Sequence, residues 1–149
     1  MKIKQGITLN QVQEVLDYTY PFFKHVISRG GFDYYMRDLA NTNWQKSALL
    51  IDDEGNLKGA YILGNHQLPS QFVQDKYVGL VGIEGLLLAV DESVRGQGWG
   101  NQLKDYPKTL GYGYIWGQQF KGLNNLKDWL KRRELVGTTD EVYITAEIF

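Results

Sequence analysis

Apolar residues recur with a helical period near the N-terminus of the sequence. From Gln11 to Phe23 they fall three or four positions apart, and Asn10 is the predicted N-cap of this helix. The same spacing from Asp33 to Ala40 predicts a second, shorter helix. The preceding segment KIKQGI is a candidate strand, so we expect one strand and two amphipathic helices at the start of the chain.

Beyond these helices the pattern changes to that of a β-sheet. The stretch SALLIDDEGNLKGAYILGN places an apolar segment on each side of the turn DDEGN, which predicts a β-hairpin. A third strand is predicted from Tyr77 to Val90. Its last part is apolar on both faces, which is typical of a strand in the middle of a sheet.

The C-terminal part of the chain alternates between the two patterns. A helix is predicted from about Gly98 to Tyr106, because Pro107 disfavours its continuation, and the segment GYGYIWGQQF is the next candidate strand. One face of a further helix is formed by Leu123, Leu126, Trp129 and Leu130, and EVYITAEIF reads as a closing strand. With no repeat or linker, the sequence predicts one α+β domain over residues 1–149 with a mixed sheet.

Composition narrows the possible functions. The 16 basic and 17 acidic residues give a net charge of -1, so a nucleic-acid partner is not expected. The absence of cysteine excludes disulfides, cysteine-bound metals and a thiol nucleophile. His25 and His66 lack a paired spacing, so no metal site is predicted. The N-terminus lacks the apolar block of a signal peptide and no stretch reads as a membrane span, so we expect a cytoplasmic protein without a membrane partner.

The segment GLLLAVDESVRGQGWGNQL concentrates glycine between a predicted strand and a predicted helix. Gly96, Gly98 and Gly100 lie where backbone N–H groups at a helix N-terminus can bind a phosphate. The spacing fits neither a Walker loop, which ends in Lys-Ser/Thr, nor the GxGxxG of a Rossmann fingerprint. A tight connection without any ligand is the alternative interpretation of this loop.

The pattern Arg95-x-x-Gly98-x-Gly100, preceded by LLLAVDESV, resembles the acetyl-coenzyme A loop of the GNAT N-acetyltransferase superfamily. The predicted order of elements over nearly the whole chain is similar to that of this family. The resemblance implies a mixed, mostly antiparallel central sheet that is flanked by helices and splayed at the coenzyme site. It also implies acetyl-CoA as the cosubstrate.

The resemblance assigns the pyrophosphate of the coenzyme to the glycine loop and its pantetheine arm to the end of the central strand. The strand near Tyr114 to Gln118 is expected to splay from the central strand at this point. The implied coenzyme-binding residues are Leu88, Ala89, Val90, Arg95, Gly96, Gln97, Gly98, Trp99, Gly100, Asn101 and Asn124.

Acetyl transfer to an amine requires a proton acceptor, because an alkylammonium has a pKa of about 10. Glu84 interrupts an apolar strand, and in the histone-acetylating branch of the family a glutamate at the matching offset is the general base. Glu84 is therefore the candidate base, and desolvation of its carboxyl group would raise its pKa. A solvated carboxylate at the start of the strand is the alternative.

The family pattern places a tyrosine on a late helix as the acid for the leaving thiolate, but this sequence has Lys131 at that position. Lys131 either stabilises the thiolate by charge or is an ordinary solvated lysine. An aromatic wall for a cationic acceptor is a further expectation, although many of the same residues suit a core. These residues are Tyr18, Tyr20, Phe23, Tyr34 and Tyr35.

Two functions follow from the resemblance. The first is an acetyl-CoA-dependent N-acetyltransferase, in which a primary amine of a small molecule, peptide or protein attacks the thioester directly in a ternary complex. The second is a non-catalytic module of the same fold that binds or senses coenzyme A, which the missing tyrosine favours. The sequence leaves the acceptor unidentified, and a homodimer is compatible with either function.

Overall fold

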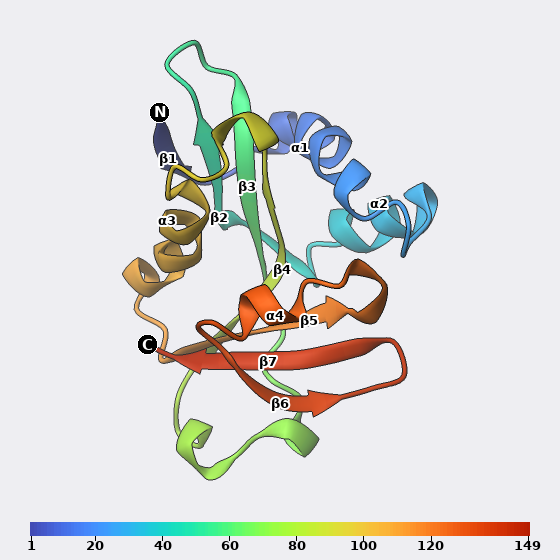
Figure 1. The fold of residues 1–149 in the computed structure, drawn as a ribbon, viewed down its shortest axis with the longest axis vertical. Helices are drawn as coiled ribbons and strands as arrows, with labels where there is room; N and C mark the ends of the chain where they lie inside the picture. Colours follow the sequence, from blue (N-terminus) through green and yellow to red (C-terminus); the bar gives the residue numbers. More distant parts are fainter.

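A seven-stranded sheet in the order β1-β2-β3-β4-β5-β7-β6 forms the centre of the computed structural model, which describes residues 1–149 (Figure 1). All neighbouring strands are antiparallel except β4 and β5, which are parallel. The predicted α+β class with a mixed, mostly antiparallel sheet is confirmed. The strands are β1 (Lys2–Gln5), β2 (Thr42–Ile51), β3 (Leu57–Gly64), β4 (Gly82–Val90), β5 (Tyr114–Phe120), β6 (Glu134–Thr138) and β7 (Val142–Ile148).

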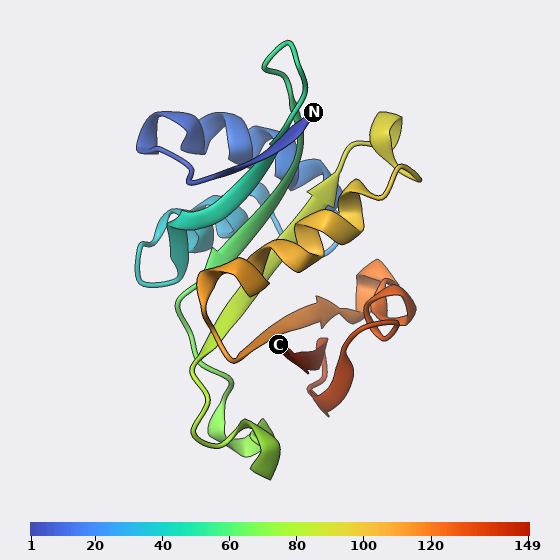
Figure 2. The ribbon, with the colours of Figure 1, turned by 90° about the vertical axis from the view of Figure 1, so that its left-hand side faces the viewer.

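Helices cover both faces of the sheet (Figure 2). On one face, α1 (Val12–Thr19) and α2 (Arg29–Arg37) bury an apolar cluster that includes Leu16, Phe32 and Ile62. On the other face, α3 (Trp99–Asp105) and the single turn α4 (Leu126–Trp129) contribute Leu103 and Trp129 to a second cluster. The sheet therefore separates these two apolar clusters, and a third cluster around β5 and β7 includes Tyr77, Trp116 and Ile144.

The parallel pairing of β4 with β5 is short. Four residue pairs are in register, from Gly82 opposite Tyr114 to Gly85 opposite Gly117. Beyond Gly117, β5 continues in pairing with β7 alone. On its other edge β4 has an irregularity, since Leu63 pairs with Gly85 and Ile62 with Leu87, which leaves Leu86 as the extra residue of a bulge. The two strands therefore separate after Gly117, and the predicted splay of the sheet is present.

The first two helices differ in extent from the prediction. A 3-10 turn at Leu9–Gln11 precedes α1, with Thr8 at its N-cap, so Asn10 is not the cap. The second helix begins at Arg29 because Ser28 Oγ accepts a hydrogen bond from the amide of Gly31 at 3.1 Å. It ends at Arg37, since Asp38 turns to an extended conformation, so the predicted end at Ala40 was wrong.

Three further boundaries were predicted wrongly. The third predicted strand begins at Gly82, because Tyr77 closes a 3-10 turn and packs edge-on against Tyr114 at 5.1 Å between ring centroids. The late helix is only one turn long, and Leu130 is 42% exposed and not part of a buried face. The edge strand β6 was missed, because its mixed, half-exposed residues carry no clear alternation.

Candidate functional site

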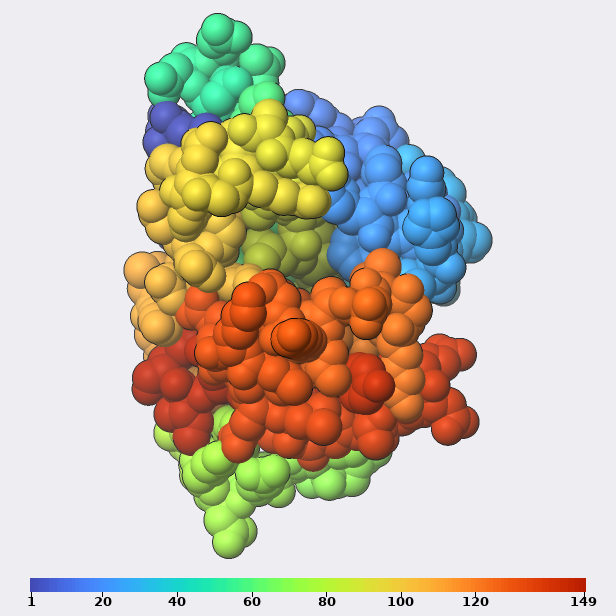
Figure 3. All heavy atoms as spheres, in the orientation of Figure 1, coloured from blue at the N-terminus to red at the C-terminus, as the bar shows by residue number.

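A hollow opens where β4 and β5 separate (Figure 3). It lies between the glycine loop in yellow, the N-terminal helices in blue and the segment after β5 in orange, with olive β4 at its floor. The outermost part, which we call the outer cavity, has a volume of about 510 Å³. Its lining includes Leu88, Val90, Arg95, Gly100 and Asn125.

Two more cavities continue from the outer cavity along the separated strands. The neck, of about 40 Å³, shares Leu88 and Asn125 with the outer cavity. The inner cavity, of about 360 Å³, shares Gly85 and Gln118 with the neck. Phe23 lines all three cavities. Their shared walls trace one path from the glycine loop, past the gap between β4 and β5, to the face of the sheet covered by α1 and α2.

The glycine loop presents free backbone donors at the outer end of this path. The amides of Gly96, Gln97 and Gly98 donate to no acceptor within the chain, and the amides of the first turn of α3 lack intrahelical acceptors by geometry. Gly96 and Gly98 have φ angles of +79° and +85°, which side-chain-bearing residues rarely adopt. The loop therefore combines unpaired donors with a helix N-terminus, as an anion site requires.

The residues predicted for the coenzyme site are not all alike in position. Leu88, Val90, Arg95 and Gly100 line the outer cavity, and Arg95 Nε donates to the carbonyl oxygen of Val90 at 3.2 Å. Gln97 and Asn101 are exposed, and Trp99 packs against the second apolar cluster. The side chain of Ala89 is buried in the sheet and lines none of the three cavities.

The asparagine of the path is Asn125 and not the predicted Asn124. Asn124 is exposed and takes a left-handed conformation, with φ 54°, at the end of a 3-10 turn. Asn125 lines the outer cavity and the neck, and its Oδ1 is buried without a hydrogen-bond partner. Since buried polar atoms are normally satisfied, this oxygen is free to accept a hydrogen bond from a molecule in the path.

Glu84 lies at the inner end of the path. Its side chain is 3% exposed, and Oε1 is 3.1 Å from Nδ1 of His66. Burial raises the pKa of Glu84, while the hydrogen bond and the charge of His66 act in the opposite direction. The carbonyl oxygen of His66 accepts a hydrogen bond from Trp116 Nε1 at 2.9 Å, which fixes the segment that carries the imidazole. This contact was not predicted from the sequence, because His66 and Glu84 are 18 positions apart in the chain.

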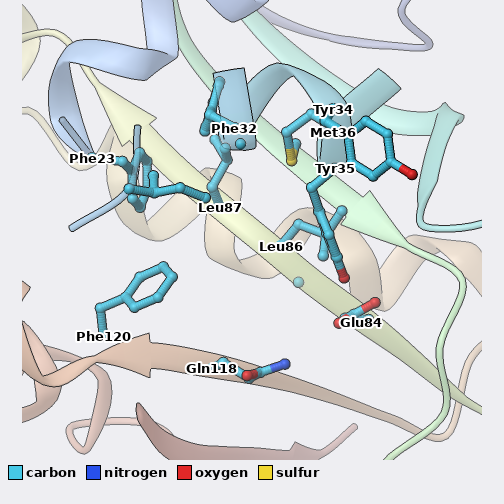
Figure 4. A pocket seen from close by; sticks show the side chains of 13 residues that line it. Phe23, Phe32, Tyr34, Tyr35, Met36, Glu84, Leu86, Leu87, Gln118 and Phe120 are labelled. Carbon is cyan, nitrogen blue, oxygen red and sulfur yellow. The ribbon is translucent and has the colours of Figure 1, made fainter. Parts of the chain in front are cut away.

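The inner cavity is lined mostly by apolar and aromatic residues, and Glu84 and Gln118 are among its few polar lining residues. In Figure 4 the ring of Tyr35 extends from α2 toward Glu84, while Tyr34 points away and is 84% exposed. The lining residues are Phe23, Ile27, Gly31, Phe32, Tyr34, Tyr35, Met36, Glu84, Gly85, Leu86, Leu87, Gln118 and Phe120. Phe23, Tyr34 and Tyr35 of the predicted aromatic wall are therefore at the cavity, whereas Tyr18 and Tyr20 are not.

Lys131 is not among the residues that line the path. Its side chain is 74% exposed, and Nζ pairs with Asp128 Oδ1 at 3.5 Å. The cationic side chain that does line the neck is Arg133, which the sequence reasoning missed because nothing local distinguishes it within KRRE. No group of three or more histidine, aspartate or glutamate side chains is arranged to hold a metal ion. None of the helices has the length and apolar character of a membrane span.

Comparison with solved structures identifies the fold. An acetyltransferase of the GNAT family from Listeria monocytogenes superposes with a TM-score of 0.66 at 15% identity, over 99% of this chain and 94% of that one. The PaiA N-acetyltransferase from Thermoplasma acidophilum, solved with coenzyme A, gives 0.65 at 10% identity over the full length of both chains. The N-acetylglutamate synthase from Neisseria gonorrhoeae, solved with coenzyme A and N-acetylglutamate, gives 0.63 at 15% identity over 99% of this chain and 34% of that one.

The sequence itself matches no family model and no curated protein. The solved structures nevertheless show that the protein has the fold of the GNAT acetyltransferases, as the resemblance of the glycine loop predicted.

Proposed function

We propose that the protein is an acetyl-CoA-dependent N-acetyltransferase. The observation that carries this proposal is the series of three adjoining cavities, which share lining residues and extend from the glycine loop to the buried carboxylate of Glu84. A long ligand with an anionic head and a reactive far end matches the two ends of this path. Coenzyme A is such a ligand, and two of the similar structures contain it.

The residues of the path fit the coenzyme part by part. The free amides of the loop from Gly96 to Gly98 suit the pyrophosphate. The edge of β4 from Leu86 to Val90 has no neighbouring strand on the β5 side, so its peptide groups can pair with the amides of pantetheine. The free Oδ1 of Asn125 is an acceptor for a pantetheine N–H. The coenzyme supplies an acetyl thioester at the inner end of this arm.

Glu84 and His66 act on the acceptor in this proposal. The amine must lose a proton when its nitrogen attacks the carbonyl carbon, and the carboxylate of Glu84 lies in the wall of the cavity that would hold the amine. Its raised pKa, which results from burial, makes it a better base than an exposed glutamate. His66 Nδ1 contacts the same carboxylate, and its ring is 48% exposed, so it connects Glu84 to solvent.

The lining of the inner cavity defines the acceptor further. No lysine, arginine or histidine lines it, so a carboxylate on the acceptor would be buried without a countercharge. Glu84 favours a cationic amine, and the aromatic and aliphatic walls favour an apolar body. The acceptor class that fits is a primary amine on an aromatic or aliphatic group that bears no nearby carboxylate.

The test is thiol release from acetyl-CoA with matched acceptors. We expect turnover with 2-phenylethylamine and with phenylalanine amide, and at least about tenfold less with phenylalanine, which differs from its amide by the carboxylate. Binding of coenzyme A is measured separately by thermal shift; at a hundredfold excess over Kd it stabilises the folded state by about 2.7 kcal/mol. Binding without turnover for any amine would support the non-catalytic module, and equal rates for phenylalanine and its amide would refute the acceptor class.

A further inference from the structure

Arg133 is a buried cation without an anionic partner. Its residue exposure is 5%, yet the carboxylates of Asp105 and Glu147 pair with its neighbour Arg132. The contacts of Arg133 are all neutral: Nη2 donates to Tyr61 Oη at 2.7 Å, Nη1 lies 3.4 Å from Thr145 Oγ1, and the guanidinium carbon is 4.0 Å from the centre of the Trp129 ring.

The contacts of Arg133 are also incomplete. Its Nε is buried and has no hydrogen-bond acceptor. Burying a charge is costly unless it is paired, so this guanidinium is a candidate partner for an anion that enters the path.

The guanidinium and the Tyr61 hydroxyl lie at the point where β4 and β5 separate. A Cβ atom added to Gly85 would be 2.7 Å from Tyr61 Oη, and one added to Gly117 would be 2.8 Å from Arg133 Nη1. Gly85 and Gly117 form the last registered pair of the two strands. The Tyr61 hydroxyl and the Arg133 guanidinium therefore lie close to the backbone of Gly85 and Gly117, at the narrowest part of the path.

Arg133 and Tyr61 both line the neck, the small cavity between the outer and inner cavities. Its volume of about 40 Å³ suits one or two heavy atoms and excludes a larger group. A ligand that extends from the glycine loop to Glu84 has to pass a narrow segment of its chain through this point. If that ligand is acetyl-CoA, the segment next to the thioester carbonyl is the sulfur atom.

We propose that Arg133, with Tyr61, forms the site that receives the sulfur of the leaving thiolate. This inference rests on the proposed acetyl transfer. The amine nitrogen forms a bond to the carbonyl carbon, the carbon–sulfur bond breaks, and its electron pair stays on sulfur. The proton of the amine goes to Glu84 and through His66 to solvent, while the negative charge on sulfur is balanced by the guanidinium.

Charge, and not proton donation, is the contribution of this pair. Burial raises the pKa of Tyr61, and the neighbouring arginines act against that shift. A thiol has a pKa of about 8.5, below the ordinary tyrosine value of about 10, and burial moves the pKa of Tyr61 further up, so the proton stays on the Tyr61 oxygen. The pair therefore stabilises sulfur as an anion, which replaces the acid that the missing tyrosine would have supplied.

The other charged groups around the neck are already engaged. Glu84 faces the inner cavity from β4 and bonds to His66. Glu147 on β7 pairs with Arg132, and Lys104 on α3 pairs with Asp128 on α4 at 2.8 Å. Arg133 is the charged group of the neck without a charged partner, whereas Lys131, for which the sequence left this role open, is exposed and paired with Asp128.

The test uses binding and not turnover. Affinities of coenzyme A and of S-methyl coenzyme A, which cannot ionise at sulfur, are measured by calorimetry from pH 6 to pH 9. If the bound thiol has a lowered pKa, coenzyme A gains affinity relative to its S-methyl analogue as pH rises. The gain amounts to about tenfold for each unit by which binding lowers the thiol pKa. The comparison cancels the titration of the phosphates, which both ligands share.

Two variants assign this effect to the proposed residues. Arg133→Met keeps the apolar volume of the side chain and should abolish the relative gain with pH, while the affinity for S-methyl coenzyme A is retained. Tyr61→Phe should reduce the gain and preserves the core if the arginine variant does not fold.

The outcomes are distinguishable. Identical pH profiles for the two ligands on the native protein overturn the proposed thiolate site, as does a gain that survives both variants. Absence of binding by both ligands refutes the proposed function itself.

Discussion

The carboxylate of Glu84 and the imidazole of His66 share a hydrogen bond of 3.1 Å between Oε1 and Nδ1. One partner is nearly inaccessible, with 3% of its side chain exposed, and the other reaches solvent, with 48% exposed. Glu84 lies on β4, and His66 follows the end of β3, the strand that pairs with β4. Their contact gives a buried base a route to water, which a carboxylate alone inside an apolar cavity would lack.

Glu84→Gln should lower turnover by about a hundredfold or more, because the amide cannot accept the proton. The affinity for coenzyme A should be unchanged, since Glu84 lines the inner cavity and not the outer one. Residual turnover should rise with pH as solvent supplies more neutral amine. Steady-state rates beside Glu54→Gln, an exposed glutamate of the β2–β3 turn, provide the control. Unchanged turnover in the Glu84 variant removes this residue from the mechanism.

His66→Ala should move the acidic limb of the kcat/KM profile to higher pH. The imidazole lowers the pKa of Glu84, so its removal raises that pKa further, and the carboxylate form needed for catalysis then appears only at higher pH. Rates measured from pH 5 to pH 9 for the variant and the native protein report the shift directly. His25→Ala is the matched control, since His25 is exposed and lines none of the three cavities. An acidic limb that stays in place contradicts the dyad.

Burial of Glu84 also predicts how stability depends on pH. Its folded-state pKa is raised above the unfolded value of about 4.3, so the folded state holds its proton more tightly. Between the unfolded and the folded pKa, rising pH therefore lowers the free energy of unfolding. Glu84→Gln removes this dependence, and its Tm relative to the native protein should be higher at pH 8 than at pH 4. A Tm difference that is constant with pH would falsify this assignment.

Gly98→Ala and Gly55→Ala form a matched pair. Both glycines have φ +85°, and an added Cβ meets no atom within 4 Å at either position. Each variant should lose roughly 1–2 kcal/mol of stability from the left-handed conformation. Only Gly98→Ala should also weaken coenzyme A binding, by about tenfold, because relief of the strain reorients the loop amides. Thermal unfolding and calorimetry separate the two effects, and equal affinities in both variants would make the loop a mere connection.

Asn125→Ala should weaken coenzyme A binding by about two- to tenfold, as expected for one neutral hydrogen bond of roughly 0.5–1.5 kcal/mol. Asn124→Gly is the control, because glycine tolerates the left-handed conformation at this position and the residue is exposed. Affinity measurements on the two variants decide which asparagine contacts the ligand. A larger loss at Asn124 would restore the assignment made from the sequence pattern.

The sequence was most informative where a structure depends on neighbouring residues. One continuous segment contains the strand that ends at Val90, the glycine loop and the helix that starts at Trp99. The spacing within this segment was therefore enough to predict the fold. Asn124 and Lys131 were placed by counting along a helix that proved to be a single turn, and both side chains are exposed in the structure.

The remaining site residues depend on contacts between distant parts of the chain. Arg133 becomes special only through Tyr61, which is 72 positions away in the sequence. His66 similarly meets Glu84 across 18 positions. Neither contact leaves a periodic or local pattern in the sequence, and of these residues only Glu84, which interrupts an apolar strand, is unusual for its position.

Only four registered residue pairs, between β4 and β5, connect the two halves of the sheet. Strands β1 to β4 form one half and β5 to β7 the other. The hollow of Figure 3 lies where β4 and β5 separate. A molecule that forms hydrogen bonds with both strands at this opening would connect the two halves where the protein has no hydrogen bonds of its own. Occupancy is therefore expected to slow amide hydrogen exchange most in the two segments that border the gap, Leu86 to Val90 and Gln118 to Phe120, which each have a neighbouring strand on one side only. The effect should be least in the distant β2–β3 turn.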